Sequence, residues 1–162
     1  MTPGIERLNA LGREEAEAEL RACCGSTAWA RRMAEERPFR DLEHLREAAE
    51  RVWQDLSRED WLEAFRAHPR IGDPKATGRA AREQIATRSA PAEVLAALAA
   101  GNRRYEAKFG HVFLICASGK SAVDMLEELE RRLPNDRQME HRVAATEQRK
   151  ITRLRLGSAF GQ

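Results

Sequence analysis

Apolar residues recur at helical spacing along almost the whole chain, and this pattern limits the fold more than any other feature. Residues 41–56 are an example, because Asp41 is followed by Leu45, Ala49 and Val52 at steps of four and three residues. Such steps place apolar side chains on one face of an α-helix, and an acid in front of them is a preferred N-terminal cap. Short polar stretches separate such segments, without a repeat or a long linker. The sequence therefore predicts an all-α bundle of about seven or eight helices.

The expected helices are bounded by capping residues and prolines. Gly25 is expected to close the first helix in a left-handed cap, and the bond before Pro38 to end the second. Gly110 is expected just past the end of a long helix, and Ser121 with Asp124 has the spacing of a capping box. From these signals we expect helices over residues 5–24, 26–37, 41–56, 57–68, 78–88, 90–109, 121–133 and 137–160.

The stretch HVFLICA, residues 111–117, departs from this pattern. It is the only concentrated apolar run with β-branched and aromatic residues. A buried extended segment and the start of a helix are both compatible with it, and periodicity does not decide between them.

Length and charge restrict the domain count and the partners. A chain of 162 residues has the size of one ordinary domain, so we expect a single domain over residues 1–162. Lys and Arg number 28 and Asp and Glu 26, which leaves +2 with the signs interspersed. A nucleic-acid surface, which needs clustered basic residues, is not expected. No apolar run approaches the ~20 residues of a membrane span, so we expect a soluble cytoplasmic protein without membrane contact.

The three cysteines, Cys23, Cys24 and Cys116, do not suggest a disulfide scaffold. Their number is odd, and adjacent cysteines rarely bridge each other because the geometry is strained. No Cys-x-x-Cys pair or histidine cluster has zinc spacing. We expect free, mostly buried thiols and no metal site.

The stretch AHPRIGD places His68 in a rigid polar turn. Pro69 stiffens the backbone after the histidine, and Gly72 relieves it. A firmly held histidine is suited to proton transfer near neutral pH. The alternative is a surface histidine at a helix C-terminus, where the helix dipole favours the imidazolium. For Arg70 and Asp73 we expect an ion pair within the turn.

Polar residues on other expected helices are further candidates. Glu83 and Gln84 are adjacent, so their side chains diverge by about 100° and share a pocket only beyond a helix end. A solvated helix face is the alternative for both. Arg155 lies between two leucines, and a basic residue within an apolar stripe suits an anionic ligand. Arg153 is expected to face solvent.

The remaining histidines carry weaker signals. His111 opens the apolar run, where it is either a core histidine or the second candidate base. His44 and His141 are expected to be exposed on helices.

Several motifs, found in order between residues 5 and 156, resemble those of one family. The combination of His-Pro-Arg-Ile-Gly, Glu-Gln and Tyr-Glu-x-Lys-Phe-Gly is specific. The family is the 2-oxo-4-hydroxy-4-carboxy-5-ureidoimidazoline (OHCU) decarboxylases of urate degradation. The resemblance rests on CCGSTAWARRMAEERPF (23–39), AHPRIGD (67–73), REQ (82–84), NRRYEAKFGHVFLICASGKSAVDML (102–126) and EQRKITRLRL (147–156).

The resemblance implies an all-α enzyme that decarboxylates OHCU to (S)-allantoin without a cofactor or a metal. It also implies a small-molecule partner and a homodimer as a possible assembly. His68 is the implied proton-transfer residue, with Glu83 and Arg155 as further catalytic residues. Family members often carry Ser where this chain has Ala80, so the hydrogen bond of that hydroxyl is missing or replaced. The substrate-binding residues implied by the resemblance are Pro69, Ala80, Ala81, Arg82, Glu83, Gln84, Phe113, Leu114, Ile115, Cys116, Ala117 and Arg155.

These residue types suit the implied chemistry. The carboxylate of OHCU lies on a carbon next to a C=N bond, which takes up the electrons released with carbon dioxide. Arg155 is suited to clamp the carboxylate or the ureido carbonyls, and Glu83 and Gln84 to pair with nitrogens. His68 is suited to deliver one proton to a single face of the new stereocentre.

Two other classes of function remain open from the sequence. A helical binding module has the same composition, but its contiguous basic or apolar face is not evident. A hydrolase would use Cys24 or Cys116 as nucleophile with His68 or His111 as base, and alkylation of the thiol would inactivate it.

Overall fold

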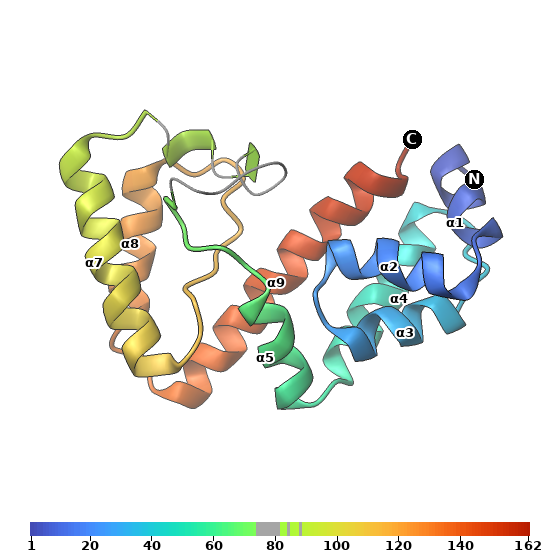
Figure 1. The fold of residues 1–162 in the computed structure, drawn as a ribbon, viewed down its shortest axis with the longest axis horizontal. Coiled ribbons are helices and arrows are strands. Elements are labelled where there is room, and N and C mark those ends of the chain that lie inside the picture. Colours follow the sequence, from blue (N-terminus) through green and yellow to red (C-terminus); the bar gives the residue numbers. More distant parts are fainter. Residues whose placement is uncertain (74–81, 84, 88) are drawn as a thin grey trace. The chain divides into compact units, whose positions relative to one another are not determined.

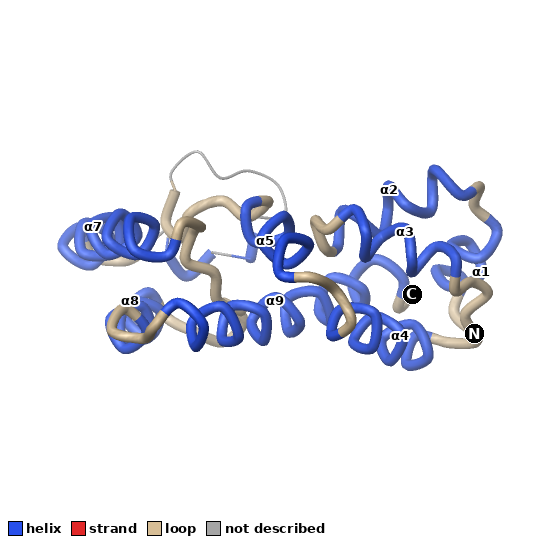
Figure 2. Tube along the Cα trace, turned by 90° about the horizontal axis from the view of Figure 1, so that it is seen from below, coloured by secondary structure: helices blue, strands red, loops and turns tan. Residues whose placement is uncertain are grey.

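The computed structural model describes residues 1–73, 82–83, 85–87 and 89–162, and its elements are helices and loops (Figures 1 and 2). Within these ranges there are eight α-helices, one short 3-10 helix, η1 (Ile85–Thr87), and no strand. The expected all-α class is confirmed. The α-helices are α1 (Pro3–Ala10), α2 (Arg13–Cys23), α3 (Thr27–Glu35), α4 (Leu42–Gln54), α5 (Arg58–Arg66), α7 (Ala92–Phe109), α8 (Ala122–Arg132) and α9 (Arg137–Phe160).

The chain forms two compact units. Unit 1 contains Met1–Ala64 and Gln148–Gln162, and unit 2 contains Phe65–Glu147. The long helix α9 contributes its first half to unit 2 and its second half to unit 1. A single domain over residues 1–162 stays a prediction.

Unit 1 joins the two ends of the chain. The N–H of Gly4 donates to the carbonyl of Gln162 at 2.7 Å, and the hydroxyl of Thr2 donates to the carbonyl of Phe160 at 2.6 Å. The core of this unit includes Trp29, which is fully buried and donates its indole N–H to the carbonyl of Ala49 at 3.2 Å. A buried indole with a satisfied N–H contributes a large apolar area without an unpaired donor.

The first expected helix, over residues 5–24, is wrong in one respect, because it is divided into α1 and α2. Leu11 and Gly12 between them have extended backbones, and Gly12 is the N-cap of α2. Glycine is a weak helix former, so the chain turns here at little cost. Gly25 forms no left-handed cap, because Cys24 already leaves the helix with an extended backbone and the φ of Gly25 is not positive.

Unit 2 is built around α7 and α8. Gly110 follows α7 with a φ of 80°, the left-handed cap expected from the sequence. Ser121 and Asp124 form a complete capping box at the start of α8. Both terminal signals are therefore confirmed, and they leave residues 111–117 between two helices. The apolar core of the unit comprises Ile71, Leu98, Tyr105, Phe113, Ile115, Ala122, Met125 and Leu129.

Residues 112–117 are neither helix nor strand. Of the two interpretations of this run, the start of a helix is therefore wrong. The segment is nevertheless buried, since Phe113, Leu114 and Ile115 are at most 3% exposed. Irregular backbone in a core needs hydrogen-bond partners from outside the segment, because it has no ladder of its own.

Candidate active site

His68 lies just beyond the C-terminal end of α5. The helix ends at Arg66, and the N–H of His68 still donates to the carbonyl of Phe65 at 3.3 Å. The side chains of His68 and Pro69 are half-buried. His68 thus follows the last turn of α5 closely, and that turn holds its backbone N–H.

The turn that carries His68 is fixed to α7. Ile71 is buried in the core of unit 2, and its carbonyl accepts a hydrogen bond from the side-chain amide of Asn102 at 3.0 Å. Arg70 pairs with Glu106, with Nε at 3.0 and 3.1 Å from the two carboxylate oxygens. Gly72 has a φ of 80°, as its expected role in relieving the turn requires. The expected ion pair within the turn is wrong, since the partner of Arg70 lies 36 residues along the chain.

Three side chains and one backbone N–H bind the backbone of residues 113–117; the backbone donor is Lys120, whose N–H donates to the carbonyl of Ala117 at 3.0 Å. The carbonyl of Leu114 accepts from Nη1 of Arg132 at 3.0 Å, and the N–H of Cys116 donates to Oε1 of Glu147 at 3.1 Å. The carbonyl of Cys116 accepts from the ammonium of Lys120 at 3.2 Å. Within the described ranges, no protein group hydrogen bonds with the backbone of Ile115. A buried backbone N–H or carbonyl without a protein partner is where a ligand or water is expected to bind.

A buried polar cluster supports this segment from behind. Arg132 and Glu140 are 2% and 0% exposed and form an ion pair, with Nε of Arg132 2.9 Å from Oε2 of Glu140. The hydroxyl of Tyr105 donates to Glu140, and the guanidinium lies 4.6 Å from the ring centre of Phe113. Burial raises the pKa of the Tyr105 hydroxyl above its usual range, and Glu140 adds to this effect. The hydroxyl therefore stays protonated and acts as a donor.

The sequence interpretation did not include Arg132, Glu140 or Glu147. A signal for Arg132 was present, because it follows Met125 and Leu129 at steps of four and three residues, on the apolar face of α8. A charged residue at such a position needs a buried partner. Nothing in the sequence pattern points to Glu140 as that partner.

His111 is a core histidine. It is 6% exposed, its ring centre lies 5.0 Å from that of Phe65 and 5.5 Å from that of Tyr105, and its Nδ1 lies 3.0 Å from the carbonyl of Val112. Burial lowers its pKa, so the neutral form is favoured. This favours the core interpretation over that of a second base.

His141 is buried, so its expected exposure is wrong. It is 7% exposed, and its ring centre lies 5.3 Å from that of Phe65. The first half of α9 packs in the core of unit 2, which the polar sequence around this residue does not reveal.

The cysteines are poorly suited to nucleophilic catalysis. Cys24 is fully buried, and burial raises the pKa of its thiol to about 12. Cys116 is also buried, and its backbone rather than its thiol forms the contacts described above. Because the thiolate is the reactive form, this environment disfavours the thiol-dependent hydrolase.

The other candidates are divided between the units. Arg82 and Glu83 lie in unit 2 with exposed side chains, and Ala117 is half-buried. Arg155 is half-buried in unit 1, where its charge acts on the nearby thiol of Cys24. The candidates Ala80, Ala81 and Gln84 lie outside the described residues, as does most of the helix expected over 78–88.

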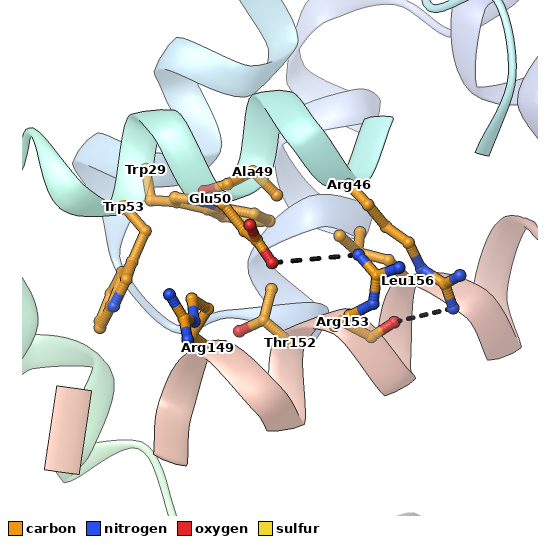
Figure 3. A pocket seen from close by; sticks show the side chains of 9 residues that line it. All are labelled: Trp29, Arg46, Ala49, Glu50, Trp53, Arg149, Thr152, Arg153 and Leu156. Atoms are coloured by element: carbon orange, nitrogen blue, oxygen red, sulfur yellow. Dashed lines mark hydrogen bonds and ion pairs between the residues drawn. The ribbon is translucent and has the colours of Figure 1, made fainter. Parts of the chain in front are cut away.

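A pocket of unit 1 contains none of the candidates among its described lining residues (Figure 3). Two of its arginines are engaged with neighbouring groups: Arg153 pairs with Glu43 at 3.1 Å and Glu50 at 3.9 Å, and Arg46 donates to the carbonyl of Arg153 at 3.3 Å. The side chain of Arg153 is 42% exposed, in line with its expected solvent-facing position. The lining residues are Trp29, Arg46, Ala49, Glu50, Trp53, Arg149, Thr152, Arg153 and Leu156.

The described part of the chain contains neither a cluster of metal ligands nor a helix that could span a membrane. Within the described ranges, no three His, Cys, Asp or Glu residues are grouped closely enough to bind a metal ion. Over the same ranges, every helix is too short or too polar to span a bilayer.

Comparison with known proteins gives a consistent result. The sequence profile of the OHCU decarboxylases matches residues 9–157. The chain belongs to the OHCU decarboxylase family. It is 37% identical over 155 residues to the uric acid degradation bifunctional protein of Arabidopsis thaliana, covering 91% of this chain and 48% of that protein. The chain therefore spans about half the length of that bifunctional relative.

Two other relatives match over most of their length. The OHCU decarboxylase of Haloferax volcanii is 30% identical over 137 residues, covering 81% of this chain and 80% of that protein. A crystal structure of an OHCU decarboxylase in the presence of (S)-allantoin has a TM-score of 0.81 and 36% identity, covering 89% of this chain and 98% of that one. The family that the motifs resemble and the family that the comparisons give are thus the same.

Proposed function

We propose that this member of the OHCU decarboxylase family converts OHCU to (S)-allantoin and carbon dioxide in urate degradation, with His68 as the proton-transfer residue. Membership of the family and the curated decarboxylases among the relatives support the reaction. The observation that carries the role of His68 is the anchored turn, in which Ile71 and Arg70 are both fixed to α7. A general acid must hold its position relative to the reacting carbon, and this turn restricts where the imidazole lies.

The reaction needs one proton and no external electrons. The bond between the ring carbon and the carboxylate carbon breaks and carbon dioxide leaves. The released electron pair forms a C=C bond to the neighbouring ureido-bearing carbon, and the C=N pair moves onto the ring nitrogen. His68, in its protonated form, then gives a proton to the ureido-bearing carbon, which becomes the stereocentre, while the hydroxyl on the decarboxylated carbon becomes a carbonyl and its proton passes to the ring nitrogen. Delivery from one fixed side produces one enantiomer.

The segment 113–117 is the second part of the proposed site. The backbone of Ile115 has no protein partner in the described ranges, and its peptide group is suited to pair with the ring or ureido amides. Pro69, which follows His68 in the chain, is also proposed to contact the substrate. The proposed binding set is completed by Ala80, Ala81, Arg82, Glu83, Gln84, Phe113, Leu114, Cys116 and Ala117.

Arg155 is proposed as the clamp for the carboxylate or the ureido carbonyls. A guanidinium offers parallel donors that match a carboxylate, and its charge stays fixed over the working pH range. Glu83 is proposed to pair with a substrate nitrogen. Because both act on the reacting molecule, both belong to the catalytic set with His68.

The proposal extends to the setting of the enzyme. We expect catalysis without a metal or an organic cofactor, in a cytoplasmic protein that acts as a monomer or a homodimer. Nucleic acids and membranes are not expected partners, because the charges are balanced and interspersed.

The test is to generate the unstable substrate in situ from urate and to follow the formation of optically active allantoin. The purified chain, treated exhaustively with a chelator, should form (S)-allantoin faster than the spontaneous reaction does. Activity that disappears on chelation and returns with a metal would contradict cofactor-free catalysis. An unchanged rate and a racemic product would contradict the decarboxylase function itself.

A further inference from the structure

We infer that Glu147 and Arg132 are positioning residues, which hold the backbone of residues 114–116 in the geometry that the reaction requires. The inference rests on the proposed function and extends it to two buried side chains that do not belong to the proposed catalytic or binding set. Both hold the segment through single, identifiable backbone atoms.

The two contacts lie on either side of Ile115. Arg132 donates to the carbonyl of Leu114 at 3.0 Å, and Glu147 accepts from the N–H of Cys116 at 3.1 Å. The carbonyl of Leu114 lies in the same peptide plane as the N–H of Ile115, and the N–H of Cys116 in the same plane as the carbonyl of Ile115. The N–H and carbonyl of Ile115 themselves have no protein partner in the described ranges. Each contact therefore fixes the orientation of one of these two peptide planes. The unpaired groups therefore keep one orientation without a protein bond of their own.

Burial makes these contacts more specific than a surface pair would be. Glu147 is 8% exposed and Arg132 is 2% exposed, so water competes poorly for either backbone group. Arg132 is itself oriented by Glu140 and by the ring of Phe113, which belongs to the same segment. The guanidinium of Arg132 thus contacts the ring of Phe113 and the backbone carbonyl of Leu114.

Arg132 and Glu147 differ in how strongly the fold is expected to depend on each. Removal of Arg132 would leave Glu140 as an uncompensated buried charge, which is expected to prevent folding. Glu147 is the better test, because Glu147→Gln keeps an oxygen acceptor for Cys116, whereas Glu147→Met keeps the approximate volume and removes the acceptor. Arg132→Lys is a second test, since it keeps the positive charge beside Glu140 and loses the planar fork that reaches Leu114.

A matched control comes from the other side of the cluster. Asn135 donates to Oε1 of Glu140 at 3.1 Å, and in the described part of the chain it forms no hydrogen bond with residues 113–117. Asn135→Ala should lower the melting temperature without changing turnover per folded molecule. It therefore separates loss of stability from loss of positioning.

Two measurements are made on each variant: steady-state kinetics per folded molecule, and hydrogen exchange of the Cys116 amide. Glu147→Met should lower kcat by about 10- to 100-fold, the usual effect of a misplacement on the order of 1 Å. Its Cys116 amide should exchange at least about tenfold faster, as expected when a local hydrogen bond is lost. Glu147→Gln should stay close to wild type in both measurements, and Arg132→Lys should lower kcat in the same direction as Glu147→Met.

Each of the following results would overturn the inference. Faster exchange at Cys116 with unchanged kcat would make the contact purely structural. An unchanged exchange rate in Glu147→Met would show that the contact does not hold the segment. Equal losses in Glu147→Gln and Glu147→Met would assign the effect to charge. If Glu147→Met does not fold, Arg132→Lys with normal kcat overturns the inference instead. Failure of the proposed function is recognised separately, because wild type itself would then be inactive while Cys116 exchange still reports on the contact.

Discussion

The side-chain amide of Asn102 lies 3.0 Å from the carbonyl oxygen of Ile71, and this hydrogen bond joins the middle of α7 to the turn that begins at His68. Ile71 is buried, so its carbonyl would otherwise lack a partner. The bond therefore contributes both to folding of unit 2 and to the position of the imidazole. Because the turn is held by its backbone, a substitution of the His68 side chain should remove the imidazole without moving the turn.

Replacing His68 with Asn or Gln should leave the fold intact and remove most of the activity. The side chain is only half-buried, so its loss leaves little space in the core and should change the melting temperature only slightly. The rate of decarboxylation should fall by roughly two to four orders of magnitude, the share of a positioned acid or base. Kinetics per folded molecule and thermal unfolding measure the two effects.

His111→Asn is the control for this prediction. His111 is buried among Phe65, Tyr105 and Phe109, so its substitution should lower stability while the surviving folded enzyme keeps most of its specific activity. An inactive His111 variant beside a normal His68 variant would reverse the assignment of the acid.

Arg155→Ala should weaken substrate capture much more than Arg153→Ala. Arg153 forms ion pairs with Glu43 and Glu50 at a surface where its side chain is 42% exposed, and such pairs contribute little. Loss of a charged hydrogen bond to the substrate is expected to cost about 1.5–3 kcal/mol, or about 10- to 100-fold in kcat/KM. Measured kcat/KM for both variants decides the matter, and a larger effect at Arg153 would identify it as the clamp.

Local signals in the sequence predicted most helices well. Residues 137–160 were expected as the last helix, and α9 has these bounds. The caps at Ser121 and Gly110 were also correct, because each depends on only a few neighbouring residues. The division at Gly12 was missed because the apolar spacing continues across it, and only the packed structure shows that the chain turns there.

Contacts between distant residues could not be predicted in this way. The motif around His68 identified the candidate, but the anchor of Arg70 is Glu106 on another helix. Similarly, the apolar run at 111–117 showed that the segment is buried, but not that Arg132 and Glu147 bind its backbone. Such pairs depend on three-dimensional proximity, which spacing along one helix does not encode.

The buried imidazole of His111 should make stability depend on pH. Burial lowers its folded-state pKa below the ordinary value of 6.5, so the unfolded chain binds a proton first as the pH falls. Stability from this residue is fully present above about pH 6.5 and decreases as the pH falls toward the lower folded-state pKa, by at most about 1.4 kcal/mol per pH unit. The free energy of unfolding of wild type and His111→Phe is measured in urea at several values from about pH 5 to about pH 7.5, the range in which histidine titrates. It should depend less steeply on pH in the variant. Parallel curves would show that other groups cause the dependence.

Gly101→Ala should destabilise unit 2, although alanine is the better helix former. Gly101 lies within α7, and a Cβ atom added there would lie 2.5 Å from Cδ2 and 3.3 Å from Cγ of Leu129, which is fully buried in α8. Overpacking costs typically about 1–3 kcal/mol, which exceeds the gain in propensity of about 1 kcal/mol.

Urea unfolding should therefore show a lower free energy of unfolding for Gly101→Ala than for wild type. Ala99→Gly, at an exposed position of the same helix, measures the difference in helix propensity alone. In a double-mutant cycle with Leu129→Ala, the two changes should couple by about 1 kcal/mol or more, because the smaller side chain removes the clash. Additive effects, or a Gly101→Ala protein more stable than wild type, would show that α7 and α8 tolerate the methyl group and that the glycine is not required by their packing.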